Sequence, residues 1–218
     1  TINGGRFRAL DEVKYWLQRR PSAMGVGLQE VCGEQYEEMK NWLNAHYQPV
    51  LWGAAYYDQH PDGREICGRT TTEPPTRFGV VAYARTTDLN RDRETAARLT
   101  PVPGNSDVED RGFACYEGGS TRWFKFCSAH MTPRTKSLSA RYVQTREYYD
   151  RVTNQVPFWR VAWGGDLNIE NGTWLSQVNR NPSQYYLEAD DCVGGRRGTI
   201  ANSSGVVHEK IDWQFVEK

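Results

Sequence analysis

Strand-like and helix-like segments alternate along nearly the whole of this chain, and this alternation limits its fold more than any other feature. Apolar residues recur at helical spacing over 7–19, 34–45 and 137–156. Apolar or alternating runs predict strands over 24–28, 50–57, 78–85, 111–117, 123–130, 160–163 and 211–216. We expect loops over 58–77, 86–110 and 181–204, and a short helix near 173–178. With no internal repeat and no linker, the pattern predicts a single α/β domain over residues 1–218.

The composition is that of a folded protein without net charge. Hydrophobic residues make up 38% and aromatic residues 12% of the 218 residues, which excludes disorder, coiled coil and collagen. No stretch approaches about 18 uninterrupted apolar residues, so we expect no membrane span. Lys+Arg and Asp+Glu are equal at 27 each, which removes the strong electrostatic case for a dedicated duplex binder.

One segment departs from this charge balance. Residues 120–160 hold eight Lys and Arg against two acidic residues. Such a patch could follow a nucleic-acid backbone, or it could be the solvated face of a helix.

The chain has five cysteines: Cys32, Cys67, Cys115, Cys127 and Cys192. No CxxC pair or histidine at ligand spacing accompanies them, so disulfides are favoured over a zinc site. If Gly118-Gly119 forms a two-residue turn, Cys115 and Cys127 lie too far apart to bond. If the loop has about five residues, 119–123, the two cysteines become cross-strand neighbours, and we favour this register. Cys32 with Cys67 is the second expected pair, and the odd Cys192 points to a partner outside these residues.

Polar side chains of similar chemistry follow four of the predicted strands. Each by itself could be a helix cap or a solvated turn. In an α/β protein, however, the loops at one end of a sheet converge, so carboxylates there can share a hard cation while a histidine and an asparagine face the same ligand. The residues are Glu30, His130, Asp166 with Asn168, and Asp212.

These residues lie in motifs that resemble the endonuclease/exonuclease/phosphatase superfamily with the deoxyribonuclease-I-like fold. The matching segments occur in family order: LQE at 28–30, FGVVAYAR at 78–85, DRGFAC at 110–115, CSAHMT at 127–132, GGDLN at 164–168 and KIDWQF at 210–215. The resemblance implies a four-layer α/β/β/α sandwich, with two packed mixed sheets flanked by helices. It also implies a divalent-metal-dependent hydrolase of phosphoester bonds.

The resemblance assigns a metal site and a water site. Glu30 corresponds to the metal-binding glutamate, and its carboxylate suits Mg²⁺, with Mn²⁺ or Ca²⁺ as alternatives. Asp166 corresponds to the aspartate that orients or deprotonates the attacking water. Asn168 beside it would donate its amide to a phosphoryl oxygen.

Three further residues are assigned to the phosphate. His130 corresponds to a phosphate-contacting histidine that, when charged, would stabilise the pentacoordinate transition state. Asp212 corresponds to the acid that orients a catalytic histidine. Arg111 is expected either to contact phosphate or to be a surface strand residue.

Two family segments are absent from the 218 residues. Thr1 stands where the family has a metal-site asparagine, and Lys218 precedes the expected Ser-Asp-His. His208 cannot replace that histidine, because four residues of extended strand separate it from Asp212 by about 13 Å. Either the chain is part of a longer protein, which we favour, or it is a degenerate member that binds phosphate without turnover. We expect the segment alone to show little hydrolysis.

The residues indicate that the substrate is a phosphoester, but they do not indicate which molecule carries it. We favour a secreted nuclease or phosphodiesterase, with DNA or RNA as candidate substrate. The alternatives are a phosphatase on inositol phosphates or phospholipids, and a non-catalytic phosphate-binding or toxin-like subunit. Secretion rests on the cysteines and on sequons at 171–173 and 202–204.

Overall fold

The computed structural model describes part of the chain in full and four C-terminal strands by their backbone alone. The fully described residues are 10–11, 13–15, 17–19, 22–60, 63, 66–67, 72, 74–86, 93–101, 110–118, 124–133, 136–153 and 160–169. The strands described by backbone are 186–188, 200–201, 207–209 and 212–217.

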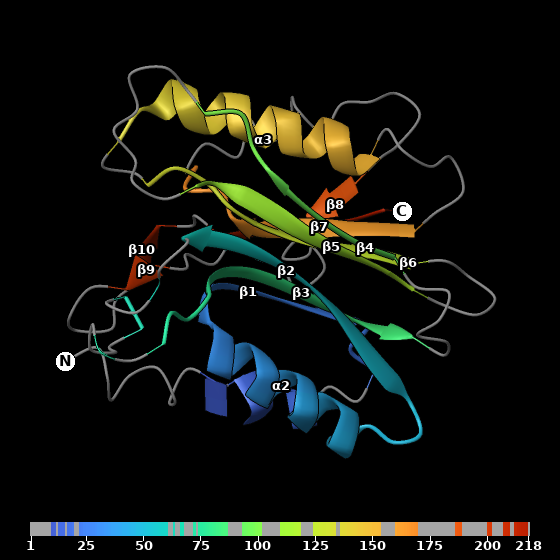
Figure 1. Cartoon of the computed structure of the whole chain (residues 1–218). Coiled ribbons are helices and arrows are strands. Elements are labelled where there is room, and N and C mark those ends of the chain that lie inside the picture. The colour runs from blue at the N-terminus through green and yellow to red at the C-terminus, as the bar shows by residue number, and fades with distance from the viewer. Residues whose placement is uncertain are drawn as a thin grey trace.

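Figure 1 shows four layers, with a helix on each outer face and two sheets between them. The small sheet is antiparallel, with the order β1-β3-β2. The large sheet is mixed, with the order β4-β5-β6-β7-β11-β8, and within it only β6 and β7 are parallel. This arrangement confirms the predicted four-layer α/β class, although two mixed sheets were expected and, in the described part of the chain, only the large sheet is mixed.

The first half of the chain builds the small sheet and its covering helix. Its elements are β1 (Gly25–Cys32), α2 (Gly33–His46), β2 (Leu51–His60) and β3 (Phe78–Thr86). Residues 10–18 are helical wherever they are described, and Leu10 and Leu17 are buried there. The expected strands and the helix over 34–45 are therefore confirmed, although β1 runs four residues beyond its predicted end.

The second half builds the large sheet. Its elements are β4 (Arg93–Arg98), β5 (Gly112–Gly118), β6 (Phe124–His130), α3 (Leu138–Thr153), β7 (Arg160–Asp166), β8 (Tyr186–Glu188) and β11 (Asp212–Glu217). A short ladder joins β9 (Ile200–Ala201) to β10 (Val207–Glu209). Helix α3 is the crossover that the parallel pair β6 and β7 requires.

Three apolar cores separate the four layers. One lies between α2 and the small sheet, around Met39, Leu43 and Trp52, and another lies between α3 and the large sheet, around Tyr148 and Trp163. The core between the sheets consists of alanines with two aromatic residues: Ala55, Ala82, Ala84, Ala114, Ala162, Tyr116 and Phe126. Because small side chains dominate there, the sheets approach closely, and the polar residues at their common edge lie within reach of one another.

Some expectations about secondary structure were wrong. The predicted loop over 86–110 contains β4, and the predicted loop over 181–204 contains β8 and β9. Strand β4 reads RETAAR and lies at the edge of the sheet, where charged residues replace the apolar alternation that marks an inner strand. The predicted helix near 173–178 lies outside the described residues.

Both expected disulfides are present. Cys115 pairs with Cys127 across β5 and β6 with their Cα atoms 4.1 Å apart, and Gly118 faces Phe124, so the loop has the five residues that we favoured. Cys32 bonds Cys67 and ties the end of β1 to the segment before β3. Cys192 lies outside the described residues.

Candidate active site

The parallel pairing of β6 and β7 brings His130 and Asp166 to the same edge of the large sheet. The two residues are register partners at the carboxyl ends of these strands. Strand β11 runs antiparallel to β7, and its first residue, Asp212, faces Asp166 in register. Three residues predicted from distant motifs therefore lie on three neighbouring strands. The side chain of Asp212 lies outside the described part of the chain, so its predicted role stays a prediction.

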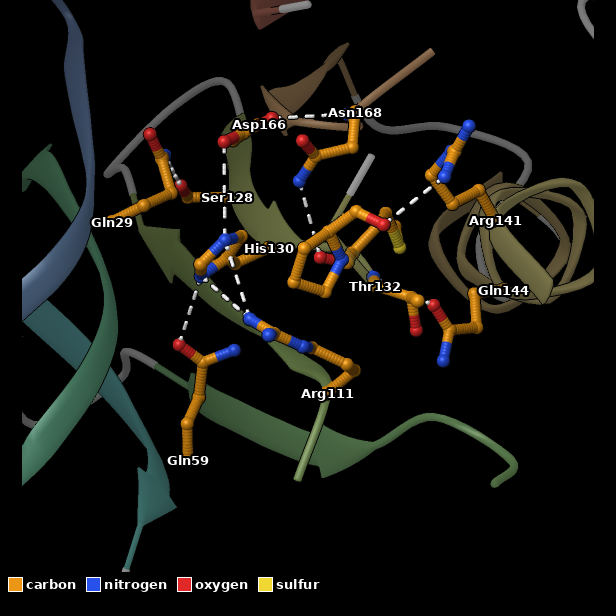
Figure 2. Close-up of polar contacts among 12 residues, drawn as sticks. Gln29, Gln59, Arg111, Ser128, His130, Thr132, Arg141, Gln144, Asp166 and Asn168 are labelled. Carbon is orange, nitrogen blue, oxygen red and sulfur yellow. Dashed lines mark hydrogen bonds and ion pairs between the residues drawn. The ribbon is translucent and has the colours of Figure 1, made fainter. Parts of the chain in front are cut away.

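His130 is the centre of a buried polar cluster (Figure 2). The ring is 4% exposed. Its Nδ1 lies 3.2 Å from Gln59 Oε1, and Arg111 Nη1 lies 3.1 Å from Nδ1 and 3.3 Å from Nε2. Asp166 Oδ2 lies 3.8 Å from Nε2, which is longer than a direct hydrogen bond. The cluster thus places an amide, a guanidinium and a carboxylate around one imidazole.

Asp166 is held by the turn that follows it. Its Oδ1 accepts the backbone N–H of Asn168 at 3.0 Å, and its carbonyl accepts the N–H of Met131 at 2.9 Å. The Asn168 side chain donates from Nδ2 to the Met131 carbonyl at 3.2 Å. A carbonyl can only accept, so this contact fixes which end of the amide is nitrogen. The carboxylate side chain keeps 21% exposure and can meet water.

Unusual backbone conformations coincide with the predicted site. Among the described residues, the two non-glycine residues with positive φ are Glu30, at 56°, and Asn168, at 54°. Such conformations are uncommon for residues with a Cβ and persist where the surrounding structure enforces them, most often at functional sites. Both were selected from the sequence for their chemistry, so this coincidence supports their assignment.

Gly165 and Tyr148 fix the end of β7. Gly165 has φ +126°, and a Cβ there would lie 2.1 Å from the carbonyl oxygen of Ala129 on β6. The buried Tyr148 hydroxyl on α3 donates to the Gly164 carbonyl at 3.1 Å and accepts the Gly164 N–H at 3.3 Å. Burial raises the pKa of Tyr148 well above its ordinary value, so this hydroxyl keeps its proton. Asp166 therefore follows a rigid pair of glycines.

Arg111 lies inside the protein, and its alternative placement as a surface strand residue is wrong. It is 4% exposed. Its carbonyl accepts the N–H of Leu99 at 2.8 Å, and the N–H of Asp110 donates to the Gln59 carbonyl at 2.9 Å. This second bond links the two sheets and brings the guanidinium to the face of His130.

Gln59 contacts the site, and the sequence does not predict this contact. It is fully buried on β2 of the small sheet, in a segment that carries no recognised motif. Only the pairing of the two sheets brings it to His130, and local spacing contains no signal for such a contact. A second unpredicted contact, Gln29 Nε2 to Ser128 Oγ at 2.6 Å, joins β1 to β6 one residue from Glu30.

Glu30 lies near the end of β1. Its side chain is exposed, at the irregular register between Leu28 and Val31, and it borders a cavity of about 230 Å³. No group of three or more His, Cys, Asp and Glu placed to hold a metal occurs among the described residues. The described residues therefore contain no metal site built from three or more of these side chains. A single exposed carboxylate fits Mg²⁺, which usually keeps water and takes one or two carboxylates with substrate phosphate.

Several basic residues of the segment over 120–160 are buried or paired in the described part of the chain. Lys125 is buried in an ion pair with Glu117 at 3.1 Å. Arg141 is buried and donates to the carbonyls of Pro133 and Lys136. Two more arginines pair with acids one helical turn away, in Arg146–Asp150 and Arg151–Glu147. Three of these basic residues are thus held in ion pairs, and of these pairs the Lys125–Glu117 pair uses an acid from outside the segment.

The fold can be compared with solved structures, although no family model and no curated protein matches the sequence. An endonuclease/exonuclease/phosphatase from Bacteroides vulgatus matches with a TM-score of 0.63 and 16% identity, over 95% of this chain and 78% of that one. The chain has the endonuclease/exonuclease/phosphatase fold.

Two further solved structures share this fold. The human Nocturnin catalytic domain, solved with a bound sulfate anion, matches with a TM-score of 0.62 and 14% identity over 97% of this chain and 74% of that one. TDP2 from D. rerio, complexed with a single-strand DNA product, matches with a TM-score of 0.60 and 12% identity over 96% and 76%. The likeness extends along the whole sandwich. At these identities it establishes the fold, and the chemistry has to be argued from the residues.

Proposed function

We propose that this protein hydrolyses phosphoester bonds with the help of a divalent metal, and that it is a secreted nuclease or phosphodiesterase. The observation that carries the proposal is the convergence of His130, Asp166 and Arg111 at one edge of the sandwich. A carboxylate that meets water beside a buried cation is the combination that phosphoryl transfer to water requires.

Asp166 is the group that handles the attacking water. Its partly exposed carboxylate can accept a proton from water, while the bond from the Asn168 backbone fixes its direction. The water then attacks phosphorus opposite the leaving oxygen. Arg111 offsets the negative charge that collects on the phosphoryl oxygens. The Asn168 amide keeps a second N–H beyond the one given to Met131, which suits a phosphoryl oxygen.

Mg²⁺ would supply further neutralisation of the phosphate, and Glu30 is the residue that would hold it. Any hydrolysis that the protein shows should be abolished by EDTA and restored by Mg²⁺. Glu30→Gln should raise the Mg²⁺ concentration needed for half-maximal rate without changing the melting temperature, because Glu30 is exposed. If the variant shows the wild-type Mg²⁺ dependence, Glu30 is not the metal ligand.

The substrate preference is drawn from the fold and its neighbours. TDP2 of D. rerio was solved with a DNA product and Nocturnin with a sulfate, an anion of the shape of phosphate. Two disulfides fit a protein of an oxidising compartment. None of the described helices could span a membrane.

The test is a substrate panel with a matched variant. Plasmid DNA, RNA, sphingomyelin and inositol phosphates are incubated with Mg²⁺ and either the wild type or Asp166→Ala. If the variant loses hydrolysis of only one of these compounds, that compound is the substrate of the site. Loss of at least about a hundredfold is expected when the group that activates the nucleophile is removed. Hydrolysis unchanged in Asp166→Ala would overturn the mechanism, and phosphate binding without turnover of any substrate would favour a non-catalytic subunit.

A further inference from the structure

Gln59 is a fully buried polar residue that makes contact with the site and has no role in the chemistry described above. It lies next to the end of β2, on the sheet opposite His130. Its Oε1 lies 3.2 Å from His130 Nδ1, while its Nε2 is buried without a hydrogen-bond partner among the described residues. Burying a donor without an acceptor destabilises the fold. A leucine would fill similar volume without this cost, so packing alone does not explain a glutamine.

The amide carbonyl determines where the ring carries its proton. A carbonyl oxygen can only accept, so the contact between Gln59 and His130 requires a hydrogen on Nδ1. In a neutral imidazole the other nitrogen, Nε2, is then an acceptor. Gln59 thus selects one tautomer of His130.

Arg111 disfavours a second proton on the same ring. Its Nη1 is 3.1 Å from Nδ1 and 3.3 Å from Nε2. A donor aimed along the lone pair of one ring nitrogen would lie much farther from the other, so the guanidinium lies against the face of the ring. A buried positive charge this close opposes protonation of the imidazole.

Asp166 has the opposite effect on the charge of the ring, and its effect is weaker than that of Arg111. Asp166 favours a charged ring, but its Oδ2 lies 3.8 Å from Nε2, and its side chain is 21% exposed, where water screens it. The guanidinium is nearer and is buried at 4% exposure. Arg111 therefore decides the charge of the ring.

We propose that Gln59 is a positioning residue that, with Arg111, holds His130 as a neutral imidazole protonated at Nδ1. The positive charge that meets the phosphate is then the guanidinium of Arg111, and His130 orients it. This differs from the charged histidine that the sequence motifs imply. The catalytic role of Gln59 rests on the proposed function, whereas the tautomer of His130 does not depend on it.

Nitrogen NMR of the whole chain labelled with ¹⁵N-histidine tests the tautomer directly. The chain has four histidines, and the signals of His130 are identified by their loss in His130→Gln. At pH 7 we expect Nδ1 to give the signal of a protonated ring nitrogen and Nε2 that of an unprotonated one. An Nε2–H tautomer would mean that the amide is turned over and donates to the ring, and it would overturn the proposal. A doubly protonated ring would do the same.

Variants of Gln59 test its control over the ring. Gln59→Glu places a carboxylate at Nδ1–H, and we expect both ring nitrogens to become protonated. Gln59→Leu removes the acceptor and should shift the ring toward the Nε2–H form. The matched control is Gln144→Leu, since Gln144 is equally buried and accepts the N–H of Thr132, two residues from His130, without touching the ring. It should leave the nitrogen pattern unchanged. An unchanged pattern in Gln59→Glu would overturn the proposal.

Activity separates this inference from the proposed function. On the substrate that the panel identifies, Gln59→Leu should lower kcat by about tenfold to a hundredfold. Loss of a hydrogen bond that orients a site residue commonly has an effect of this size. Equal kcat in Gln59→Leu and wild type would overturn the positioning role. If no substrate is hydrolysed, the proposed function fails while the NMR result still decides the tautomer.

Discussion

Replacing Gly165 by alanine should weaken the fold at the point where Asp166 is positioned. At φ +126° a residue with a Cβ carries strain of about 1–3 kcal/mol. The new Cβ would also lie 2.1 Å from the oxygen and 2.7 Å from the nitrogen of Ala129. These are backbone atoms of the neighbouring strand, so β6 and β7 must separate locally and weaken hydrogen bonds worth about 0.5–1.5 kcal/mol each. We expect a total loss of about 3 kcal/mol or more.

The loss is measured by urea unfolding and by thermal melting. For a chain of this size, about 3 kcal/mol corresponds to a fall in Tm of roughly 6–12 °C. Gly33→Ala is the matched control. Gly33 opens α2, and a Cβ there meets only the Thr76 hydroxyl at 3.2 Å and atoms of Arg77 beyond 3.5 Å. It should change stability by no more than about 0.5 kcal/mol.

Function should respond as well. Moving β7 away from β6 shifts Asp166 relative to His130, so Gly165→Ala should lose hydrolysis well below its own Tm. The reasoning fails if Gly165→Ala unfolds within about 0.5 kcal/mol of the wild type. It also fails if a destabilised but folded variant keeps full activity.

Two other properties can be checked without a substrate. Burial, with added repulsion from Asp110, raises the pKa of Tyr57 to about 12. The stability that Tyr57 contributes should therefore be fully present below pH 10 and be lost between pH 10 and 12. Unfolding midpoints over this range should fall less steeply in Tyr57→Phe than in the wild type. Thiol reductant with alkylation and peptide mapping should open Cys32–Cys67 before Cys115–Cys127, because Cys67 is half-buried whereas the other pair is at most 1% exposed. Since the first bridge spans 35 residues, its loss should cost about 4 kcal/mol, and simultaneous opening of both bridges would contradict this order.

Much of the candidate site could be predicted from the sequence because it sits in short motifs at strand ends. GGDLN and CSAHMT mark Asp166, Asn168 and His130 by local spacing, and the apolar runs before them predict the strands that carry them. Helices α2 and α3 were predicted for the same reason, since their apolar residues recur at helical spacing. Strand β4 was missed because a charged edge strand lacks the apolar alternation on which such prediction relies.

The sequence by itself indicated the α/β class, a set of candidate site residues and two alternative registers for the cysteine hairpin. Tertiary structure decided the rest. Pairing of β5 with β6 selected one register, and the packing of the two sheets buried Arg111 and brought Gln59 to His130. It also buried Lys125 and Arg141 of the basic segment. The physical reason is that these contacts join residues far apart in the chain, whose approach depends on the burial of whole sheet faces and leaves no trace in local spacing.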